Sequence, residues 1–329
     1  MNWSGRKVVV TGAGGFIGSH LSEQLVREGA DVTALVRYTS RGDHGLLRLL
    51  PPDIRSAICV IAGDLRNPEA VRRSVKGQDV VFHLAALIAI PYSYVHPTEV
   101  AQVNVIGTSN VLQAARDAGV SKVVHTSTSE VYGTAQTVPI NEEHRLTGQS
   151  PYSASKIGAD ALAHSYWRSF GLPVATIRPF NTYGPRQSGR AVIPTITGQA
   201  LHGDKIALGS LTPTRDFTYV TDVAAAFLAI AASDAAVGEV LNVGSGREIS
   251  IGALATRIVQ RVGRSVPIET TAQRSRPQSS EVFRLVCDAS RAKAMVGWEP
   301  TVSLDDGLDR VIDFMKAHPE WTDIDRYEV

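Results

Sequence analysis

Apolar residues recur along the first half of the chain in short runs that alternate with helical patterns. The runs are rich in β-branched residues and cover positions 7–11, 31–36, 58–62, 80–86 and 121–126. Continuous apolar runs of this length are typical of parallel strands buried on both faces of a sheet. Between them, apolar residues at helical spacing predict helices, one from Ile17 to about Gly29 and another over 99–118. This alternation predicts an α/β fold with a doubly wound parallel sheet.

The second half of the chain is less regular, with shorter elements and scattered prolines. We expect two interleaved lobes, 1–180 and 181–329, with a segment near 215–245 that returns to the sheet through a strand at 241–244. Asp222 is predicted to cap a helix that starts at Val223. An amphipathic helix is predicted from Leu304.

Composition narrows the class of protein. The chain has 329 residues, of which 43% are hydrophobic, enough for one large α/β domain or two lobes. Its net charge is +1, with no basic block or acidic tail, so nucleic acid is not an expected partner. Cys59 and Cys287 lie far apart without a Cys-x-x-Cys motif, which favours a reducing compartment and no zinc site. Without a signal peptide or a membrane-length apolar run, a soluble cytoplasmic protein is expected, with no membrane partner.

A glycine turn follows the first strand directly. Gly12, Gly15 and Gly18 stand at Gly-x-x-Gly-x-x-Gly spacing between the strand and the helix. In a dinucleotide-binding unit, the first glycine permits the tight turn, the second lets the pyrophosphate approach, and the third lets the helix pack on the strand. The phosphates then lie at a helix N-terminus. We therefore expect a Rossmann domain over 1–180, against the alternative of a purely structural turn.

The end of the second strand bears on the choice of cofactor. NAD-binding proteins usually carry Asp or Glu there for the ribose hydroxyls. This chain has Arg37, Ser40 and Arg41 instead, which can hold a 2′-phosphate, so NADP is favoured over NAD unless these are merely solvated loop residues. Asp64 and Leu65 follow the third strand and are expected at the adenine edge. The small residues of 84–86 (Leu84, Ala85 and Ala86) are expected where the cofactor crosses the sheet, while His83 is interpreted as a core histidine.

A tyrosine and a lysine provide the candidate chemistry. Tyr152 and Lys156 are spaced i, i+4, so a helix presents them on one face. A neighbouring ammonium lowers the pKa of a phenol, which makes Tyr152 a candidate base for a hydroxyl proton while hydride leaves the same carbon. Thr128 can share that hydroxyl, and Ser129 with Glu130 forms a second proton-handling pair. The alternative is an ordinary Tyr-Lys pair on a helix surface.

These segments together resemble the extended short-chain dehydrogenase/reductase family, which acts largely on nucleotide-activated sugars. The resemblance rests on 12–18, Asp64, 84–86, Asn104, 126–133, 152–156 and 178–185. It implies that Tyr152 is the catalytic base, that Lys156 tunes it and binds the nicotinamide ribose, and that Thr128 supports the sugar hydroxyl. It also implies a homodimer through the helix at 99–118 and the helix that carries Tyr152.

The resemblance implies further binding residues. Phe16, Ile17, Asn104 and Pro179 join the cofactor site. The nucleotide sugar is expected to contact residues that lie in or near the second lobe: Asn181, Val192, Arg215, Arg276 and Glu281. Arg215 and Arg276 are expected at the diphosphate and Glu281 at the ribose, although either arginine can also be an ordinary surface residue.

The residues after Thr128 bear on the reaction. Thr128-Ser129-Glu130 is similar to the triplet of GDP-mannose 4,6-dehydratases, in which a C4 ketone acidifies C5 and the Glu130 carboxylate removes that proton as the C6 hydroxyl leaves. The apolar segment 87–94 departs from hexose dehydratases and suggests a sugar with an N-acetyl group. The segments 126–159 and 178–194 resemble dehydratases of the legionaminic-acid type, which act on nucleotide-linked N-acetylglucosamine.

Other activities stay open at this point. A 4-epimerase needs no carboxylate at position 130, and a UDP-glucuronate decarboxylase needs a cationic partner, for which Arg186 or Arg190 is available. Loss of water across C5 and C6 that leaves an exocyclic alkene uses much the same residues. Non-catalytic dinucleotide-binding regulators generally lose the Tyr-Lys pair, which this chain keeps. The nucleotide itself is not specified by these motifs.

Overall fold

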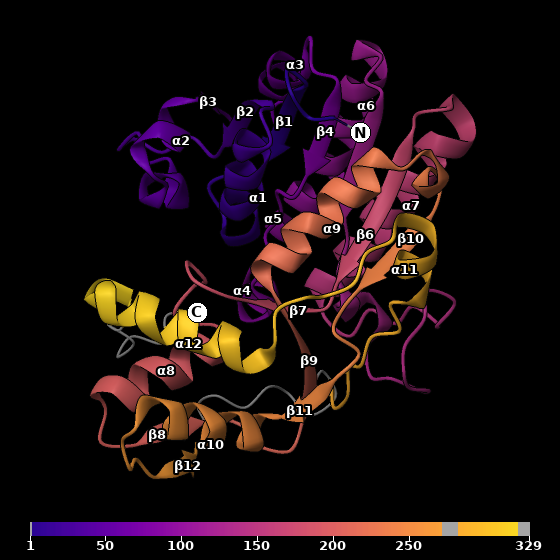
Figure 1. Ribbon diagram of the computed structural model, residues 1–329. Coiled ribbons are helices and arrows are strands. Elements are labelled where there is room, and N and C mark those ends of the chain that lie inside the picture. The colour runs from indigo at the N-terminus through magenta and orange to yellow at the C-terminus, as the bar shows by residue number, and fades with distance from the viewer. Residues whose placement is uncertain (1, 272–281, 322–329) are drawn as a thin grey trace.

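A seven-stranded parallel sheet forms the centre of the protein. The computed structural model describes residues 2–271 and 282–321. The strand order is β10-β6-β5-β4-β1-β2-β3, so the chain winds outward in both directions from β1 (Figure 1). The strands are β1 (Lys7–Thr11), β2 (Asp31–Val36), β3 (Ile58–Ala62), β4 (Val80–His83), β5 (Lys122–Thr126), β6 (Val174–Pro179) and β10 (Val240–Val243). The predicted doubly wound parallel sheet is confirmed.

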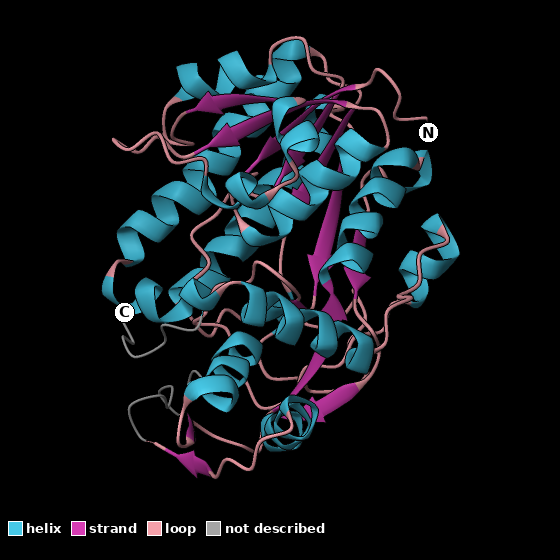
Figure 2. Ribbon diagram, turned by 60° about the vertical axis from the view of Figure 1, so that its left-hand side comes forward, coloured by secondary structure: helices cyan, strands magenta, loops and turns pink. Residues whose placement is uncertain are grey.

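Helices cover both faces of this sheet, as Figure 2 shows. Val8 and Val10 of β1 face α1 (Phe16–Arg27) and α9 (Val220–Ala232), whereas Val9 faces the opposite side. That side is covered by α3 (Pro68–Val75), α6 (Gly107–Ala118) and α7 (Pro151–Phe170). Successive strand residues point to opposite faces, and helices cover both of these faces. Val8, Val9 and Val10 are therefore all buried, which explains the continuous apolar runs.

The predicted helix over 99–118 contains a π turn. It is built from α5 (Pro97–Ala101), the π segment η2 (Gln102–Ile106) and α6. Asn104 lies inside the π segment, where its side chain accepts a hydrogen bond from Leu87 N and donates one to Leu87 O. Extra turns of this kind often occur at functional sites.

The second lobe has its own core. Tyr183, Ile196, Leu254 and Leu308 are buried together there. Its helices are α8 (Val192–His202), α10 (Ile251–Val262) and α12 (Leu304–Ala317), which lie below the main sheet in Figure 1. Two small sheets accompany them, one of β7 (Asn181–Tyr183), β9 (Thr214–Tyr219) and β11 (Glu248–Ser250) and one of β8 (Ile206–Leu208) and β12 (Ile268–Thr270).

Short elements complete the described chain. They are α2 (Pro52–Ser56), α4 (Ile90–Val95), α11 (Ser290–Val296) and the single turns η1 (Gly45–Leu49), η3 (Ser129–Tyr132), η4 (Asp234–Ala236) and η7 (Pro319–Trp321). Over residues 2–271 and 282–321, no helix combines the length and apolar character needed to cross a membrane.

Two local predictions are wrong. The fourth strand ends at His83 rather than Ala86, because the next residues leave the sheet and Asn104 binds the backbone of Leu87. Asp222 does not cap a helix from Val223, since α9 begins at Val220. Its carboxylate instead accepts hydrogen bonds from Thr301 and Val302 and ties α9 to the segment before α12.

Candidate active site

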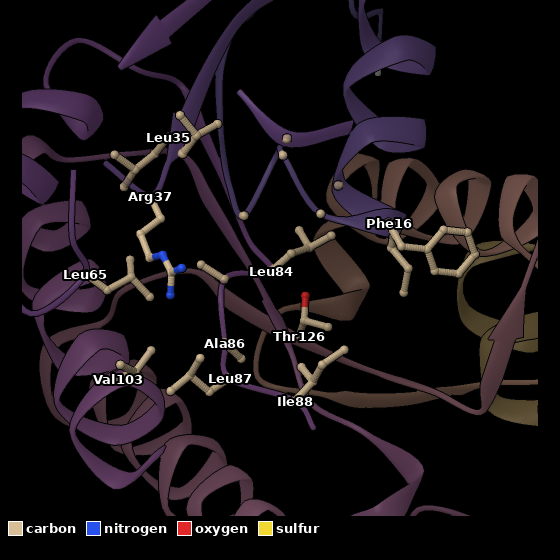
Figure 3. A pocket seen from close by; sticks show the side chains of 18 of the residues that line it. Phe16, Leu35, Arg37, Leu65, Leu84, Ala86, Leu87, Ile88, Val103 and Thr126 are labelled. Carbon is tan, nitrogen blue, oxygen red and sulfur yellow. The ribbon is translucent and has the colours of Figure 1, made fainter. Parts of the chain in front are cut away.

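One cavity of about 640 Å³ opens at the carboxyl ends of the parallel strands. It is lined by the glycine turn, the ends of β2, β4 and β5, the start of α7 and the segment after β6 (Figure 3). This is the position at which doubly wound sheets bind ligands. The predicted residues on its wall are Gly12, Gly15, Phe16, Ile17, Gly18, Arg37, Asp64, Leu65, Leu84, Ala85, Ala86, Thr128, Tyr152, Lys156 and Pro179.

The glycine turn forms a cradle that side chains would fill. Gly12 has φ +73°, and a Cβ there would lie 2.8 Å from the backbone of Ala85. A Cβ on Gly18 would press against the carbonyl oxygen of Gly12. Gly15 is the N-cap of α1 and offers no side-chain acceptor to the helix. The first N–H groups of α1 can therefore donate hydrogen bonds to an anion. The turn therefore fits a dinucleotide pyrophosphate.

Charged residues gather at the β2 end of the cavity. The guanidinium of Arg37 projects inward between Leu65 and Leu84 (Figure 3). Asp64 accepts a 2.6 Å hydrogen bond from Arg66, which lowers the pKa of Asp64, and the charge of Arg37 adds to this shift. Ser40 and Arg41 do not line the cavity, although Thr39, Asp43 and His44 of the same loop do.

The wall that follows β4 is mostly apolar. Leu84, Ala85, Ala86, Leu87 and Ile88 form it along the chain that follows β4. Asn104, predicted as a cofactor residue, is fully buried behind this wall and holds Leu87 in place. His83 is buried as predicted, with its ring nitrogens 2.8 Å from Thr11 Oγ1 and 2.9 Å from Thr108 Oγ1.

Tyr152 and Lys156 lie one turn apart at the start of α7. Ser150 caps this helix in a capping box with Ser153, which fixes where the turn that carries Tyr152 begins. Burial raises the pKa of Tyr152, and a hydrogen bond with Thr128 opposes this. Burial lowers the pKa of Lys156 to about 8, and its Nζ donates to Thr126 O at 2.6 Å. The expected lowering of the pKa of Tyr152 by Lys156 is therefore wrong for this structure, because burial of the phenol dominates.

Ser129 and Glu130 lie beside the cavity rather than on its wall. Both belong to η3, which Thr128 caps by accepting a 3.2 Å hydrogen bond from Glu130 N. Ser129 is buried. Glu130 is close enough that its negative charge raises the pKa of Tyr152. The structure thus brings Thr128, Tyr152 and Lys156 together at the wall, with the Glu130 carboxylate in electrostatic contact.

The predicted substrate residues are spread more widely. Asn181 follows the wall residue Phe180, and its buried Oδ1 has no hydrogen-bond partner within the described residues. Val192 begins α8 away from the wall. Arg215 is buried in β9, where its Nη1 donates to Thr214 O. Arg276 and Glu281 lie outside the described residues.

Some wall residues were not predicted. Thr126 and Ser127 line the cavity before Thr128, and the run of hydroxyl residues there is a signal that was available in the sequence. The Oγ1 of Thr126 is buried and has no hydrogen-bond partner among the described residues. Gln187 also lines it, held by a hydrogen bond to Thr182 O, but no sequence pattern marks it. Among the described side chains, no group of His, Cys, Asp and Glu forms a candidate metal site.

Comparison with known proteins gives the family. The family model described as GDP-mannose 4,6 dehydratase matches residues 9–311. A UDP-glucose 4-epimerase of Mycolicibacterium smegmatis is 35% identical, over 94% of this chain and 98% of its own length. The dTDP-glucose 4,6-dehydratase DesIV of Streptomyces venezuelae, solved with NAD and TYD bound, is 31% identical with a TM-score of 0.87, covering 95% of this chain and 98% of its own.

A further solved relative carries a different sugar. The UDP-N-acetylglucosamine 4-epimerase of Methanobrevibacter ruminantium, in complex with UDP-N-acetylmuramic acid, is 28% identical with a TM-score of 0.87 and covers 95% of this chain and 99% of its own. The glycine turn, the Tyr-Lys pair and the cavity thus occur on a chain that aligns over nearly its whole length with nucleotide-sugar dehydratases and epimerases. The chain belongs to the extended short-chain dehydrogenase/reductase family of nucleotide-sugar dehydratases and epimerases.

Proposed function

We propose that this protein is a nucleotide-sugar 4,6-dehydratase that acts on a nucleotide-linked N-acetylhexosamine. The observation that carries the proposal is a carboxylate, Glu130, within electrostatic reach of the Tyr152 phenol and next to Thr128. A 4-epimerase has no use for a base at this position, whereas dehydration requires one at C5.

The side chains divide the work as follows. Tyr152, hydrogen-bonded to Thr128, takes the proton of the C4 hydroxyl, and Lys156 on the same wall holds the nicotinamide ribose. A bound nicotinamide dinucleotide supplies the oxidising equivalent at C4 and returns the reducing equivalent at C6. Glu130 removes the C5 proton, and Ser129 or Glu130 assists the C6 hydroxyl as it leaves as water. A proton then returns to C5, so the product differs from the substrate by one water.

NADP is the favoured dinucleotide. Arg37 projects into the cavity at the end of β2, where a ribose-binding carboxylate is usual in NAD enzymes. A guanidinium there suits a 2′-phosphate because it binds phosphate oxygens through paired charged hydrogen bonds. Ser40 and Arg41 lie off the wall, so the support rests on Arg37.

The sugar is inferred from the apolar wall that follows β4. Leu87 and Ile88 line the cavity, and Ile88 is 67% exposed, which leaves an apolar surface for an N-acetyl methyl group. The solved relative with UDP-N-acetylmuramic acid shows that this fold accepts an N-acetylated sugar in that protein.

A 4-epimerase is the second candidate, because the Mycolicibacterium smegmatis relative is a UDP-glucose 4-epimerase. The decarboxylase alternative loses support: Arg186 is buried against His20 and paired with Glu23 at 2.8 Å, and neither it nor Arg190 lines the cavity. A non-catalytic regulator would not need Tyr152 and Lys156 at one cavity wall.

Exchange of Glu130 for glutamine tests the proposal. We expect Glu130→Gln to lose at least about a hundredfold in water loss, the usual contribution of a general base, while substrate oxidation persists as a transient rise in absorbance at the wavelength of the reduced cofactor. Ser169→Ala, an exposed change at the far end of α7, is the matched control. Normal dehydration by Glu130→Gln would remove Glu130 from the mechanism.

The homodimer stays a prediction. Ile106 and Val95 are more than half exposed on the segment before α6, which suits burial against a second copy of the chain. Light scattering gives the mass in solution.

A further inference from the structure

A buried polar cluster lies one helical turn beyond Lys156, and of its residues only Ser127 lines the cavity. Its centre is Asp160 of α7, a residue that is 8% exposed. One oxygen lies 3.0 Å from His125 Nε2, and the other accepts a hydrogen bond of 2.6 Å from Ser127 Oγ. Arg178 of β6 donates to that second oxygen from Nε at 3.3 Å and Nη2 at 3.0 Å. Three elements, α7, β5 and β6, therefore meet at one carboxylate.

The cluster continues to the other end of the catalytic segment. Arg178 Nη1 donates to the hydroxyl of Tyr132 at 2.9 Å, and the guanidinium lies over the Tyr132 ring at 5.1 Å. The Tyr132 hydroxyl donates in turn to Asn242 Oδ1 at 2.7 Å. Ser127 precedes Thr128, and Tyr132 follows Glu130 by two residues. The cluster thus holds the segment with Thr128, Ser129 and Glu130 at both of its ends.

Charge in the cluster is balanced around Asp160. Burial alone would raise the pKa of Asp160, but the hydrogen bond and charge of His125, together with the charges of Arg178 and Lys156, lower it to about 2. Burial lowers the pKa of Lys156, and Asp160 is the charge that opposes this effect. Other ionisable groups face the pair from neighbouring elements: His125 on β5, His83 on β4, Arg178 on β6, and Tyr152 on α7. Burial lowers the pKa of both histidines below the ordinary value, and the hydrogen bond with Asp160 opposes this effect at His125.

A purely structural salt bridge is the alternative to a functional one. Buried ion pairs contribute little net stability, because desolvation offsets the attraction. A cluster kept for packing alone would affect unfolding and nothing else. One that acts on the active site must also change the ionisation of Lys156 or the placement of Thr128, because those are the groups in its reach.

We propose that Asp160 is a positioning residue for this active site: its carboxylate stabilises the ammonium of Lys156 and, with Arg178, fixes Ser127 and thereby Thr128 against Tyr152. The placement of Thr128 rests on the proposed function, because its effect is measured as turnover. The effect of Asp160 on Lys156 does not rest on it. Asp160 itself does not line the active-site cavity, and it acts through Lys156 and Ser127, which do.

The ionisation of Lys156 is measured directly by NMR. Protein labelled with [13Cε]lysine is titrated from pH 6 to pH 11, and the resonance of Lys156 is assigned by its loss in Lys156→Met. The wild type is expected to titrate near pH 8. In Asp160→Asn the midpoint falls by about one pH unit, the effect of removing one nearby opposite charge. Asp160→Glu keeps the negative charge, so its midpoint is expected to lie within about half a pH unit of the wild-type midpoint.

Glu23→Gln serves as the matched control. It removes the negative charge from a partly buried pair, that with Arg186 at 2.8 Å, and neither residue lines the cavity. It lowers the urea midpoint of unfolding and leaves the titration of Lys156 unchanged. A folded Asp160→Asn variant with the wild-type midpoint would overturn the proposal. So would a Glu23→Gln variant that shifts the midpoint equally.

Ser127→Ala covers the case in which Asp160→Asn does not fold. It removes one hydrogen bond to Asp160 and keeps the buried charge. The proposal predicts a fall in kcat of about fivefold with KM unchanged, the effect of one lost hydrogen bond in the positioning of Thr128. Wild-type kcat in this variant would contradict it. If no nucleotide sugar is turned over at all, the proposed reaction fails, while the NMR titration still decides the role of Asp160.

Discussion

Gly12 is the residue at which the account can be tested by adding a single methyl group. Its φ of +73° lies in the left-handed region, and the Cβ of an alanine there would lie 2.8 Å from N and Cα of Ala85. Both atoms belong to backbone, so no side-chain rotation relieves the contact. Gly263, at the end of α10, has a similar φ of +77° but nothing within 4 Å of the corresponding position. The two glycines differ in surroundings and share the same backbone constraint.

The magnitude follows from these two terms. An L-residue in the left-handed region costs about 1–2 kcal/mol, which Gly263→Ala and Gly12→Ala share. The contact with Ala85 adds about 1–3 kcal/mol in Gly12→Ala alone, the usual cost of an overfilled site. Relief of that contact moves the turn away from Ala85, so the affinity for the dinucleotide falls about tenfold for each 1.4 kcal/mol lost in binding.

Urea unfolding and dinucleotide titration measure the two effects separately. Gly12→Ala is expected to lose about 2–5 kcal/mol of stability and at least about tenfold in affinity for NADP+ or NAD+. Gly263→Ala is expected to lose only about 1–2 kcal/mol and to bind the dinucleotide as the wild type does. Equal affinity in both variants would refute the assignment of Gly12 to the cofactor cradle.

Three further predictions concern the site and its surroundings. Tyr152→Phe is expected to abolish both oxidation at C4 and water loss, measured by absorbance and by mass spectrometry, and a fully active variant would contradict the role of the phenol. Arg37→Asp is expected to weaken NADP+ by about tenfold or more and to favour NAD+, measured by calorimetry; an unchanged ratio of the two affinities would exclude Arg37 as the selector. Burial and the charge of Arg186 lower the pKa of His20 to about 4. Below pH 6.5, His20 is therefore protonated in the unfolded chain but stays neutral in the folded chain. The free energy of unfolding falls by up to about 3 kcal/mol as the pH drops from 6.5 to 4. His20→Gln is expected to flatten that part of the stability curve in urea unfolding at pH 7 and pH 4.5, and an equal loss in both proteins would contradict it.

The main sheet could be predicted because its signals are local. Strands β1, β2 and β3 coincide with their apolar runs. For β1 and β2 the reason is that a strand covered on both faces is buried at nearly every position. The end of β4 could not be predicted, because the apolar run continues past His83 and the backbone leaves the sheet under the control of Asn104, a residue distant in sequence. The π turn around Asn104 could not be predicted either, because the contact of Asn104 with Leu87 joins residues that are distant in sequence.

The site was predictable as a set of motifs and not as an electrostatic environment. Tyr152, Lys156 and Thr128 meet at one wall as their spacing suggests. The pKa of Tyr152 depends on burial, which the sequence does not contain, so the expected influence of Lys156 was misjudged. Asp160 stands in the same helix but gains its partners from β5 and β6, and only the fold brings His125 and Arg178 to it.

Mass spectrometry of the reaction in heavy water distinguishes 4,6-dehydration from the other activities of this family. The purified protein is incubated with UDP- and GDP-N-acetylglucosamine, UDP-glucose and UDP-glucuronate, each with NADP+ and with NAD+. We expect a product from an N-acetylhexosamine substrate that has lost one water and carries deuterium at C5. A product of unchanged elemental composition with altered chromatography would identify a 4-epimerase, and loss of carbon dioxide a decarboxylase; either result would contradict the account.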